Sequence, residues 1–178
     1  MSDIKFSDET LAVANKIIAR YPEGKQKSAL IPLLHLAQAE FDGWLSQASM
    51  DYVASLLKIQ SIEAYEVASF YSMFNLNPVG KCLIEVCRTS SCWLRGANEV
   101  IDHIEKKLGI KEGETTADGM FTLKTVECLG SCGTAPIMMI GAQYHENLSH
   151  EMVDGILDQC KTEANRKTYL DKVVVDKY

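Results

Sequence analysis

Four of the six cysteines stand in two close pairs, and cysteine thiolates are ligands in both zinc and iron–sulfur centres. Cys87 and Cys92 form the first pair, with four residues between them, and Cys128 and Cys132 form the second, with three between them. Each pair comes just after a strand-like run, so each is expected in a loop at the end of a strand. Two such loops can close around one centre, and a [2Fe–2S] cluster bound by all four cysteines is our leading hypothesis.

A [2Fe–2S] cluster contains two irons, and each iron takes two protein thiolates. The spacing assigns Cys87 and Cys92 to one iron and Cys128 and Cys132 to the other. Four thiolates make such a site anionic overall, so it needs hydrogen-bond donors and positive charge nearby. We expect Cys92 at the start of a helix that opens at Trp93, where free N–H groups and the positive end of the helix dipole face the sulfurs.

Further donors and charges flank the cysteines in the sequence. Gly130 and Gly133 allow the loop backbone to turn its N–H groups toward the sulfurs. Arg88 and Arg95 are near enough in sequence to lend positive charge, and we expect them to raise the reduction potential of the centre. Protein-film voltammetry of an Arg88→Gln variant tests this hypothesis, which requires a downward shift.

The spacing of the cysteines leaves other chemistries open. Structural zinc sites with four cysteines also use close pairs, and a zinc-stabilised adaptor would bind a partner through its helices without redox chemistry. A thiol oxidoreductase is less favoured, because the chain has no Cys-x-x-Cys motif. Cys82, on the strand before the first pair, and Cys160, at the end of the last predicted helix, are interpreted as small core residues.

Size and composition are those of an ordinary soluble protein. The 178 residues, 47% of them hydrophobic and 24% charged, suffice for one good core or two small ones. A net charge of −6 argues against nucleic-acid binding, which needs clustered Lys and Arg. The N-terminus lacks a signal-peptide pattern, and no apolar run approaches the ~20 residues that span a bilayer. We therefore expect a soluble chain with reduced cysteines.

The N-terminal part of the chain has the apolar periodicity of helices. Helices are predicted from the N-cap Ser7 toward Pro22, from Ser28 to the break at Asp42, through Met50–Leu57, and from the N-cap Ser61 onward. These helices predict a small bundle, which we assign as a first domain, 1–77.

The same part of the chain contains an aromatic cluster and a single histidine. Phe70, Tyr71, Met73 and Phe74 are predicted to lie in the core of the bundle. The alternative is that one face of the bundle is a docking surface. His35 is alone on an apolar helix, and we interpret it as a structural histidine with its hydrogen bonds satisfied rather than as a ligand.

The pattern changes after Pro78–Gly80, and a second domain, 78–160, is predicted to be a two-layer α/β unit. The predicted order is a strand at Cys82–Val86, a helix opened by Trp93 and ended by Gly109, a strand at Phe121–Val126, a strand at Ile137–Ile140, a short strand at Tyr144 and a helix capped by Ser149. Residues 161–178 are predicted to be a mixed-charge tail.

The chain resembles the small thioredoxin-like [2Fe–2S] subunit of respiratory NADH:quinone oxidoreductase (complex I). The matching stretches are Val86–Gly96, Asp118–Thr122 and Cys128–Pro136, with further similarity at Gly43–Leu45, Val67–Phe74 and Pro78–Gly80. The resemblance covers roughly residues 8 to 160 and includes all four paired cysteines. It implies an α+β fold in which an N-terminal helical bundle is followed by a thioredoxin-like ferredoxin domain. It also suggests a cis peptide bond before Pro136.

The resemblance further implies a function and a partner. Members of this family hold one [2Fe–2S] cluster beside a flavoprotein subunit that carries FMN and the NADH site, and they store single electrons beside a two-electron donor. The chain itself has no G-x-G-x-x-G motif and no P-loop, which agrees with NADH and FMN binding on the partner. The implied location is the peripheral arm of a membrane-bound complex, on the cytoplasmic face. Related subunits serve NAD-linked hydrogenases and formate dehydrogenases, and these are alternatives.

Overall fold

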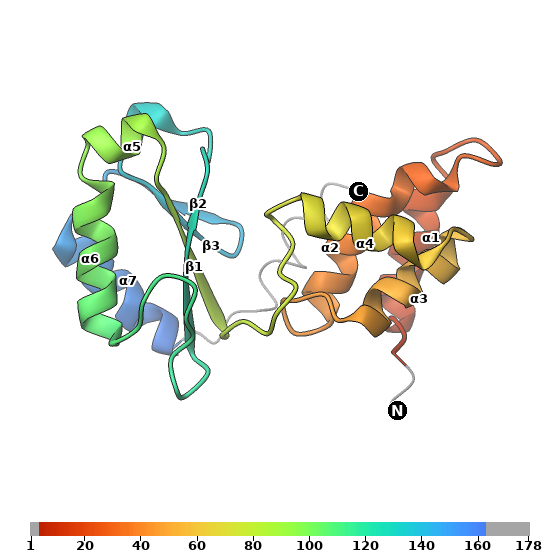
Figure 1. The fold of residues 1–178 in the computed structure, drawn as a ribbon, viewed down its shortest axis with the longest axis horizontal. Coiled ribbons are helices and arrows are strands. Elements are labelled where there is room, and N and C mark those ends of the chain that lie inside the picture. The colour runs from red at the N-terminus through yellow and green to blue at the C-terminus, as the bar shows by residue number, and fades with distance from the viewer. Residues whose placement is uncertain (1–3, 163–178) are drawn as a thin grey trace. The chain divides into compact units, whose positions relative to one another are not determined.

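Helices alone make up the first part of the chain, and a sheet with helices makes up the second (Figure 1). The computed structural model describes residues 4–162. A break between Pro78 and Val79 separates two compact units, which we call the helical unit and the sheet unit. The predicted domain boundary at 77/78 lies next to this break. The predicted tail from Lys161 onward lies outside the described residues, except that Lys161 and Thr162 belong to the last helix.

The helical unit contains four α-helices and one short 3-10 helix. In chain order these are α1 (Asp8–Ile18), η1 (Gln26–Ala29), α2 (Leu30–Glu40), α3 (Gln47–Leu57) and α4 (Ser61–Phe70). All four predicted helices are therefore present. Pro32 lies in the first turn of α2, where its missing N–H would have no partner in the helix.

Two helix starts show how local hydrogen bonds set the boundaries. The Ser7 side chain accepts a hydrogen bond from the Thr10 backbone N–H, so the predicted N-cap of α1 is confirmed. The predicted cap of α4 was one residue too late. Ser61 is already helical, and the N-cap is Gln60, whose backbone N–H donates to the Glu63 carboxylate at 2.9 Å.

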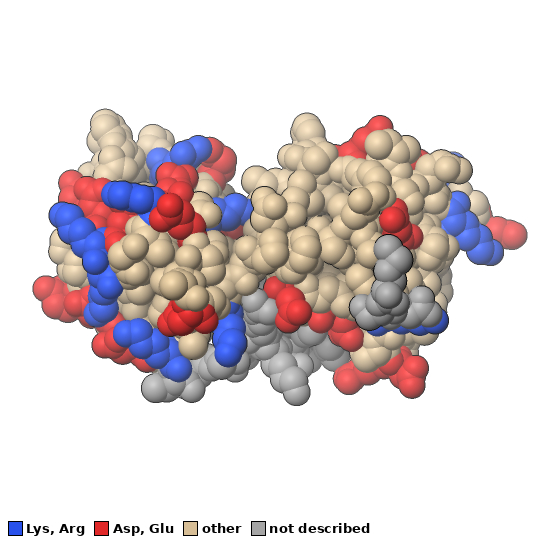
Figure 2. Space-filling model, turned by 60° about the horizontal axis from the view of Figure 1, so that its bottom comes forward, with Lys and Arg blue, Asp and Glu red and all other residues tan. Residues whose placement is uncertain are grey.

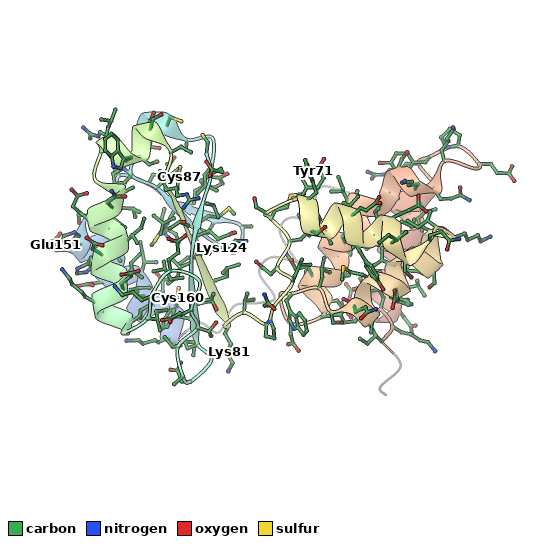
Figure 3. All side chains as sticks on the ribbon, viewed as in Figure 1. Tyr71, Lys81, Cys87, Lys124, Glu151 and Cys160 are labelled. Carbon is green, nitrogen blue, oxygen red and sulfur yellow. The ribbon has the colours of Figure 1, made fainter. Side chains whose placement is uncertain are left out.

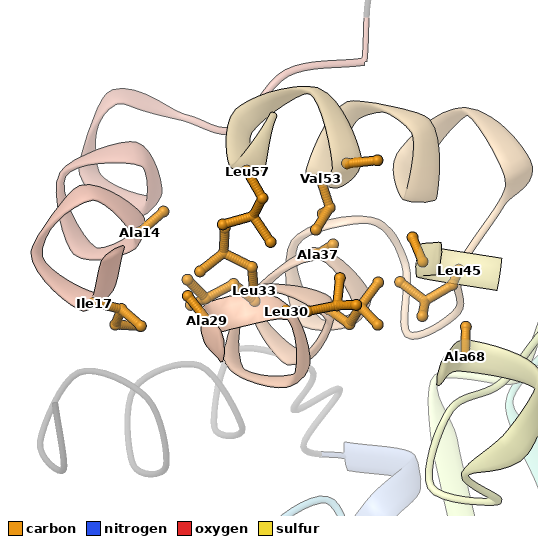
Figure 4. Packing of buried hydrophobic residues seen from close by; sticks show 14 of the residues in the cluster. Ala14, Ile17, Ala29, Leu30, Leu33, Ala37, Leu45, Val53, Leu57 and Ala68 are labelled. Carbon is orange, nitrogen blue, oxygen red and sulfur yellow. The ribbon is translucent and has the colours of Figure 1, made fainter. Parts of the chain in front are cut away.

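The core of the helical unit is formed by aliphatic side chains from all of its α-helices. The side chains labelled in Figure 4 are Ala14, Ile17, Ala29, Leu30, Leu33, Ala37, Leu45, Val53, Leu57 and Ala68. Leu33 and Val53 have no exposed surface, and Leu57 has 1%. Burying one such Leu or Val side chain contributes about 1.5–3 kcal/mol, so this periodic apolar pattern is what stabilises the bundle.

The predicted aromatic core at the end of α4 is largely wrong. Phe74 is buried, but Phe70 is 78% exposed, and Tyr71 and Met73 are 40% and 38% exposed. Phe70 and Tyr71 contact each other edge to face, with ring centroids 5.0 Å apart. Helix α4 ends at Phe70, so the helical periodicity that placed these residues inward does not extend to the turn that follows.

Up to residue 162, the sheet unit has four strands, three α-helices and one 3-10 helix. Its elements are β1 (Cys82–Cys87), α5 (Ser90–Leu94), α6 (Ala97–Leu108), β2 (Phe121–Val126), the 3-10 helix η2 (Cys132–Thr134), β3 (Met138–Ile140), β4 (Gln143–His145) and α7 (His150–Thr162). The strand order is β2-β1-β3-β4. Strands β1 and β2 are parallel, and β3 and β4 join antiparallel, which completes an α+β fold.

Buried and half-buried side chains alternate along most of β1, because successive residues point to opposite faces of the sheet. Cys82, Ile84 and Val86 are buried and pack in one cluster with Val100 and Ile104 of α6. Residues Val153 and Leu157 of α7 belong to the same cluster. Both helices thus cover one face of the sheet, as Figure 1 shows, and the unit has two layers as predicted.

The single helix predicted from Trp93 to Gly109 is two helices. Gly96 adopts a left-handed φ of 94° between α5 and α6, and this conformation interrupts the helix. Gly109 ends α6 with a φ of 67°, as predicted. The interruption re-aims α5, so Leu94 is 74% exposed instead of continuing the apolar stripe of α6.

The backbone at Gly80 lies too close to β2 for any residue with a side chain. A Cβ atom at Gly80 would lie 2.7 Å from the backbone carbon of Phe121. The Gly80 N–H also donates to the Thr122 hydroxyl at 2.6 Å. A larger residue would push the start of β1 away from β2.

Candidate metal centre

The first cysteine pair lies at the end of β1 and in the short helix that follows. Cys87 is the last residue of β1, and its backbone N–H donates to the Ile137 carbonyl at 3.1 Å. Its thiol lies 3.2 Å from the Thr89 hydroxyl. Cys92 is the third residue of α5. Each of these cysteines has 1% of its surface exposed, so the first pair is buried.

The second pair lies in the loop after β2. Cys128 follows β2 by two residues, and Cys132 begins the 3-10 helix η2. Their sulfurs are 3.6 Å apart, and both residues are exposed. The Gly130 N–H donates to the Cys128 sulfur at 3.4 Å. This side of the centre therefore faces the surface, in contrast to the first pair.

Parallel pairing of β1 and β2 brings the two pairs to the same end of the sheet. Cys87 pairs with Val126, so the chain leaves both strands at one level and in one direction. Cys87 and Cys92 also pack in a small buried cluster with Ala135 and Ile137, which follow the second pair. The bond before Pro136 is cis, as the resemblance suggested.

The electrostatics of the thiols show that the four groups interact. Burial raises the pKa of Cys87, but hydrogen bonds from the Thr89 hydroxyl and from the backbone N–H groups of Thr89 and Leu129 more than offset it, so its pKa lies below the usual value. Burial, with a hydrogen bond to Cys87, raises the pKa of Cys92 to about 11. The hydrogen bond with Cys128 raises the pKa of Cys132, and charge on Cys87 adds to the effect.

This donor set fits a two-iron cluster in number and in grouping. All six cysteines of the chain are thiols rather than disulfides. Cys87 interacts with Cys92, and Cys128 with Cys132, as two pairs. Between residues 4 and 162, His, Cys, Asp and Glu side chains do not form any group of three or more that could hold a metal ion. The thiols are thus present as pairs, with weaker electrostatic coupling from one pair to the other.

The predicted donors around the cysteines are placed unequally. Gly130 has a φ of 84° and donates to sulfur, so its predicted role is supported by both conformation and contact. Gly133 has an ordinary φ, and a Cβ atom there would meet nothing within 4 Å. Cys92 is the third residue of the five-residue helix α5, which begins at Ser90, so the predicted helix start at Trp93 is wrong, although Cys92 still lies in the first turn of a helix.

The two arginines expected to lend positive charge lie at the surface. The Arg88 guanidinium lies 3.8 Å from the Glu112 carboxylate and 3.7 Å from that of Glu127. Arg88 is 54% exposed at its side chain, so its charge is both screened by solvent and shared with two carboxylates. Arg95 is exposed at the junction of α5 and α6.

Cys82 and Cys160 lie together at the other end of the sheet unit. Cys82 is the first residue of β1, and Cys160 packs against the same buried cluster from α7. Figure 3 shows Cys87 and Cys160 toward opposite ends of the unit. Cys82 and Cys87 are five residues apart on one strand, or about 16 Å. A hydrogen bond with Cys160, together with burial, raises the pKa of Cys82, as suits a protonated core thiol.

One group of residues near the second pair carried no sequence signal. Glu146 accepts hydrogen bonds from the Ser131 hydroxyl and, at 2.6 Å, from the Thr134 hydroxyl. The Tyr144 hydroxyl donates to the Leu129 carbonyl at 2.9 Å. The sequence predicted the two strands of the β3–β4 hairpin, but it did not show which side chains of the cysteine loop the returning strand contacts.

Charge is distributed differently on the two units. In the view of Figure 2, side chains of both signs cover the sheet unit, whereas the visible face of the helical unit is mostly uncharged. No helix between residues 4 and 162 combines the length and the apolar character of a membrane-crossing segment.

Comparison with known proteins identifies close relatives. The chain is 45% identical over 162 residues to a subunit of the NADH-quinone oxidoreductase of Rickettsia prowazekii, covering 91% of this chain and 92% of that protein. It is 46% identical to the mitochondrial NADH dehydrogenase [ubiquinone] flavoprotein 2 of Dictyostelium discoideum, covering 91% of this chain and 66% of that protein.

The fold is also similar to part of a solved structure, that of an NAD⁺-reducing [NiFe]-hydrogenase. The TM-score is 0.67 at 18% identity, over 83% of this chain and 25% of that chain. At this identity the likeness concerns the fold. The family model described as thioredoxin-like [2Fe–2S] ferredoxin matches residues 14–161, which include both cysteine pairs. The chain therefore belongs to the thioredoxin-like [2Fe–2S] ferredoxin family.

Proposed function

We propose that this chain is the electron-transfer subunit of the NADH dehydrogenase module of a respiratory NADH:quinone oxidoreductase. In this proposal it holds one [2Fe–2S] cluster, which exchanges single electrons with FMN in a partner flavoprotein subunit. The relatives at about 45% identity support this assignment, because their names place them in that complex and they match nearly the whole chain. The convergence of two cysteine pairs at one end of the sheet is the observation that carries it.

Each part of the site has a separate task in this proposal. Cys87 and Cys92 bind one iron in the buried part of the centre, and Cys128 and Cys132 bind the other at the surface. The Gly130 N–H and the Thr89 hydroxyl donate hydrogen bonds to sulfurs and so stabilise negative charge there. Thiol protons leave when the ligands bind metal, so binding is coupled to proton release.

The proposal also assigns the binding sites of NADH and FMN and the location of the chain in the complex. NADH and FMN bind to the flavoprotein partner, and this chain supplies no complete active site of its own. The complex is membrane-bound, and this chain lies in its peripheral arm on the cytoplasmic face.

Purification with natural metals available tests the cluster assignment. The expected protein is reddish brown, contains two irons and two acid-labile sulfides per chain, and loses visible absorption when dithionite is added. A colourless protein with one zinc and no labile sulfide would show the zinc-stabilised adaptor instead. Turnover of a disulfide substrate without metal would show a thiol oxidoreductase.

Co-purification tests the assignment to a complex. The expected partner is a flavoprotein that oxidises NADH and passes electrons toward quinone. Recovery of the chain with a hydrogenase or a formate dehydrogenase would keep the cluster assignment but replace the respiratory one.

A further inference from the structure

The segment Tyr144–Leu148 crosses back over the loop that carries the second cysteine pair, and we call it the brace. Its backbone continues the pairing of β3 and β4 beyond their ends. The Asn147 N–H donates to the Thr134 carbonyl at 2.7 Å, and the Leu148 N–H donates to the Pro136 carbonyl at 3.1 Å. The brace is therefore anchored to the chain on the C-terminal side of Cys132.

Side chains of the brace bind the loop itself. One carboxylate oxygen of Glu146 accepts from the hydroxyls of both Ser131 and Thr134, which flank Cys132 at one and two residues. The Tyr144 hydroxyl donates to the carbonyl of Leu129, the residue after Cys128. The brace thus holds the residue after Cys128 and the residues on both sides of Cys132.

Glu146 brings an exposed negative charge to the loop of the second cysteine pair. Its carboxylate points at a loop whose two cysteines bring negative charge when they are thiolates. The two hydroxyl donors keep Glu146 ionised, since their hydrogen bonds lower its pKa. An amide at this position would accept the same hydrogen bonds without adding negative charge.

We propose that Glu146 is a positioning residue that fixes the Cys128–Cys132 loop through Ser131 and Thr134 and that its charge lowers the reduction potential of the centre. This inference rests on the proposed function, because it assumes that these cysteines bind the cluster. Fixing the loop slows ligand release, and the added negative charge disfavours the uptake of an electron.

Two substitutions separate the two effects. Glu146→Ala removes the acceptor as well as the charge, and Glu146→Gln removes the charge but keeps an acceptor. Glu151→Gln is the matched control, because it removes one carboxylate from the first turn of α7 in the same unit. Figure 3 shows Glu151 on the α6–α7 side of the unit.

The first measurement is the rate of iron release to a chelator from the intact, cluster-loaded chain, followed by the loss of visible absorption. Glu146→Ala should release iron about 10- to 100-fold faster than the wild type, the range typical for loss of a hydrogen-bonding partner behind a ligand. Thr134→Val should also release iron faster, because it removes one donor with little change of shape. Glu146→Gln should stay close to the wild type.

The second measurement is the midpoint potential from a redox titration followed by electron paramagnetic resonance. Glu146→Gln should shift the midpoint upward, and Glu151→Gln should leave it unchanged. If Glu146 only stabilised the fold of the loop, Glu146→Gln would leave the midpoint potential unchanged.

The inference is overturned if Thr134→Val and Glu146→Ala release iron at the wild-type rate, or if Glu146→Gln has the midpoint of the Glu151→Gln control. Should Glu146→Ala fail to assemble, Thr134→Val and Glu146→Gln still decide between these outcomes. A wild-type protein without iron and sulfide would instead remove the proposed function, and the inference with it.

Discussion

Single cysteines differ in burial and position in ways that predict different consequences of the same substitution. Cys87, Cys92, Cys128 and Cys132 gather where β1 and β2 end, whereas Cys82 contacts Cys160 at the start of β1. A cysteine that ligates iron loses a thiolate ligand when it becomes serine, whereas a core cysteine only gains a hydroxyl.

The first prediction follows for the cysteine-to-serine series. Each substitution at the four paired cysteines should abolish or strongly alter the visible and paramagnetic resonance spectra and lower the iron content. Cys82→Ser and Cys160→Ser are the controls, and both should keep the spectrum. Cys82→Ser should destabilise the fold by about 1–3 kcal/mol, because it buries a poorly satisfied hydroxyl, and Cys160→Ser, at a half-buried position, should cost less. An essential Cys82 would require a different ligand set.

Arg88 provides a second prediction at this scale. Arg88→Gln leaves the carboxylates of Glu112 and Glu127 without their shared cation, so the neighbourhood of Cys87 becomes more negative. The reduction potential should therefore fall, although by less than for a buried arginine because solvent screens this charge. Protein-film voltammetry measures the shift, with Arg20→Gln in the helical unit as the control. An unchanged potential would show that Arg88 does not act on the centre.

The sequence was sufficient to identify the four paired cysteines, because their spacing and the strand-like runs before them are local features. The division of the predicted Trp93 helix at Gly96 could not be predicted, because a glycine inside a helical pattern does not always interrupt it. The role of Gly133 could not be judged, because it depends on how the loop after β2 folds. Glu146 could not be found, since the strands of its hairpin are predictable but its contacts with Ser131 and Thr134, 15 and 12 residues earlier in the chain, are not.

At the scale of helices and strands, the periodicity of apolar residues predicted which elements form but not where some of them end. The strands β1 and β2 and the Ser149-capped start of α7 appear where alternation and capping placed them. The turn after α4 was taken as core because apolar residues continue past Phe70. Composition alone cannot show where a helix stops when Gly and Pro come several residues later.

His35 on α2 is a buried titratable group, so it makes the stability of the helical unit depend on pH. Its ring packs against Phe74, with centroids 4.9 Å apart, and its Nδ1 is the one buried side-chain nitrogen or oxygen in the described residues that lacks a hydrogen-bond partner. The prediction of a structural histidine stands, but its hydrogen bonds are not all satisfied. Burial lowers the pKa of His35 below its ordinary value of 6.5.

The third prediction concerns the pH dependence of stability. Because the pKa of His35 is lower in the folded state, the unfolded chain takes up the proton first as pH falls below 6.5. The free energy of unfolding should thus decrease from about pH 7.5 to about pH 5.5. His35→Leu should reduce this decrease and leave stability at neutral pH equal or higher.

Urea unfolding followed by far-UV circular dichroism at several pH values measures this dependence. Leu34→Met, at a buried position on the same helix and without a titratable group, is the control and should keep the wild-type slope. Part of the slope should persist in His35→Leu, because burial also lowers the pKa of His145. A slope identical to that of the wild type would contradict the role of His35.

At the scale of the whole molecule, we propose that the two units are independent domains, divided as predicted at residues 77 and 78. The hydrophobic core cluster of the helical unit lies between Phe6 and Phe74, and those of the sheet unit lie between Cys82 and Leu157. Each unit thus has the apolar core that separate folding requires.

The fourth prediction is that a chain beginning at Val79 folds and binds the cluster. It should show the spectrum of the full protein, because it contains all six cysteines and the brace. The complementary chain, 1–78, should be helical by circular dichroism and colourless. A shortened chain that binds no iron, while the full chain does, would show that the centre needs the helical unit.

The exposed side of the centre leads to the last prediction, which concerns the flavoprotein partner. Cys128 and Cys132 are exposed, and Trp93 and Leu94, which follow Cys92 in α5, are 57% and 74% exposed. Exchange of electrons requires close approach on this side, and exposed aromatic and aliphatic side chains there suit an interface.

Leu94→Asp should weaken association with the flavoprotein about tenfold or more, measured by co-purification and titration, while the spectrum of the cluster stays unchanged. Met152→Asp, at a 46% exposed position on α7, is the control and should assemble normally. Equal assembly of both variants would place the partner on another surface.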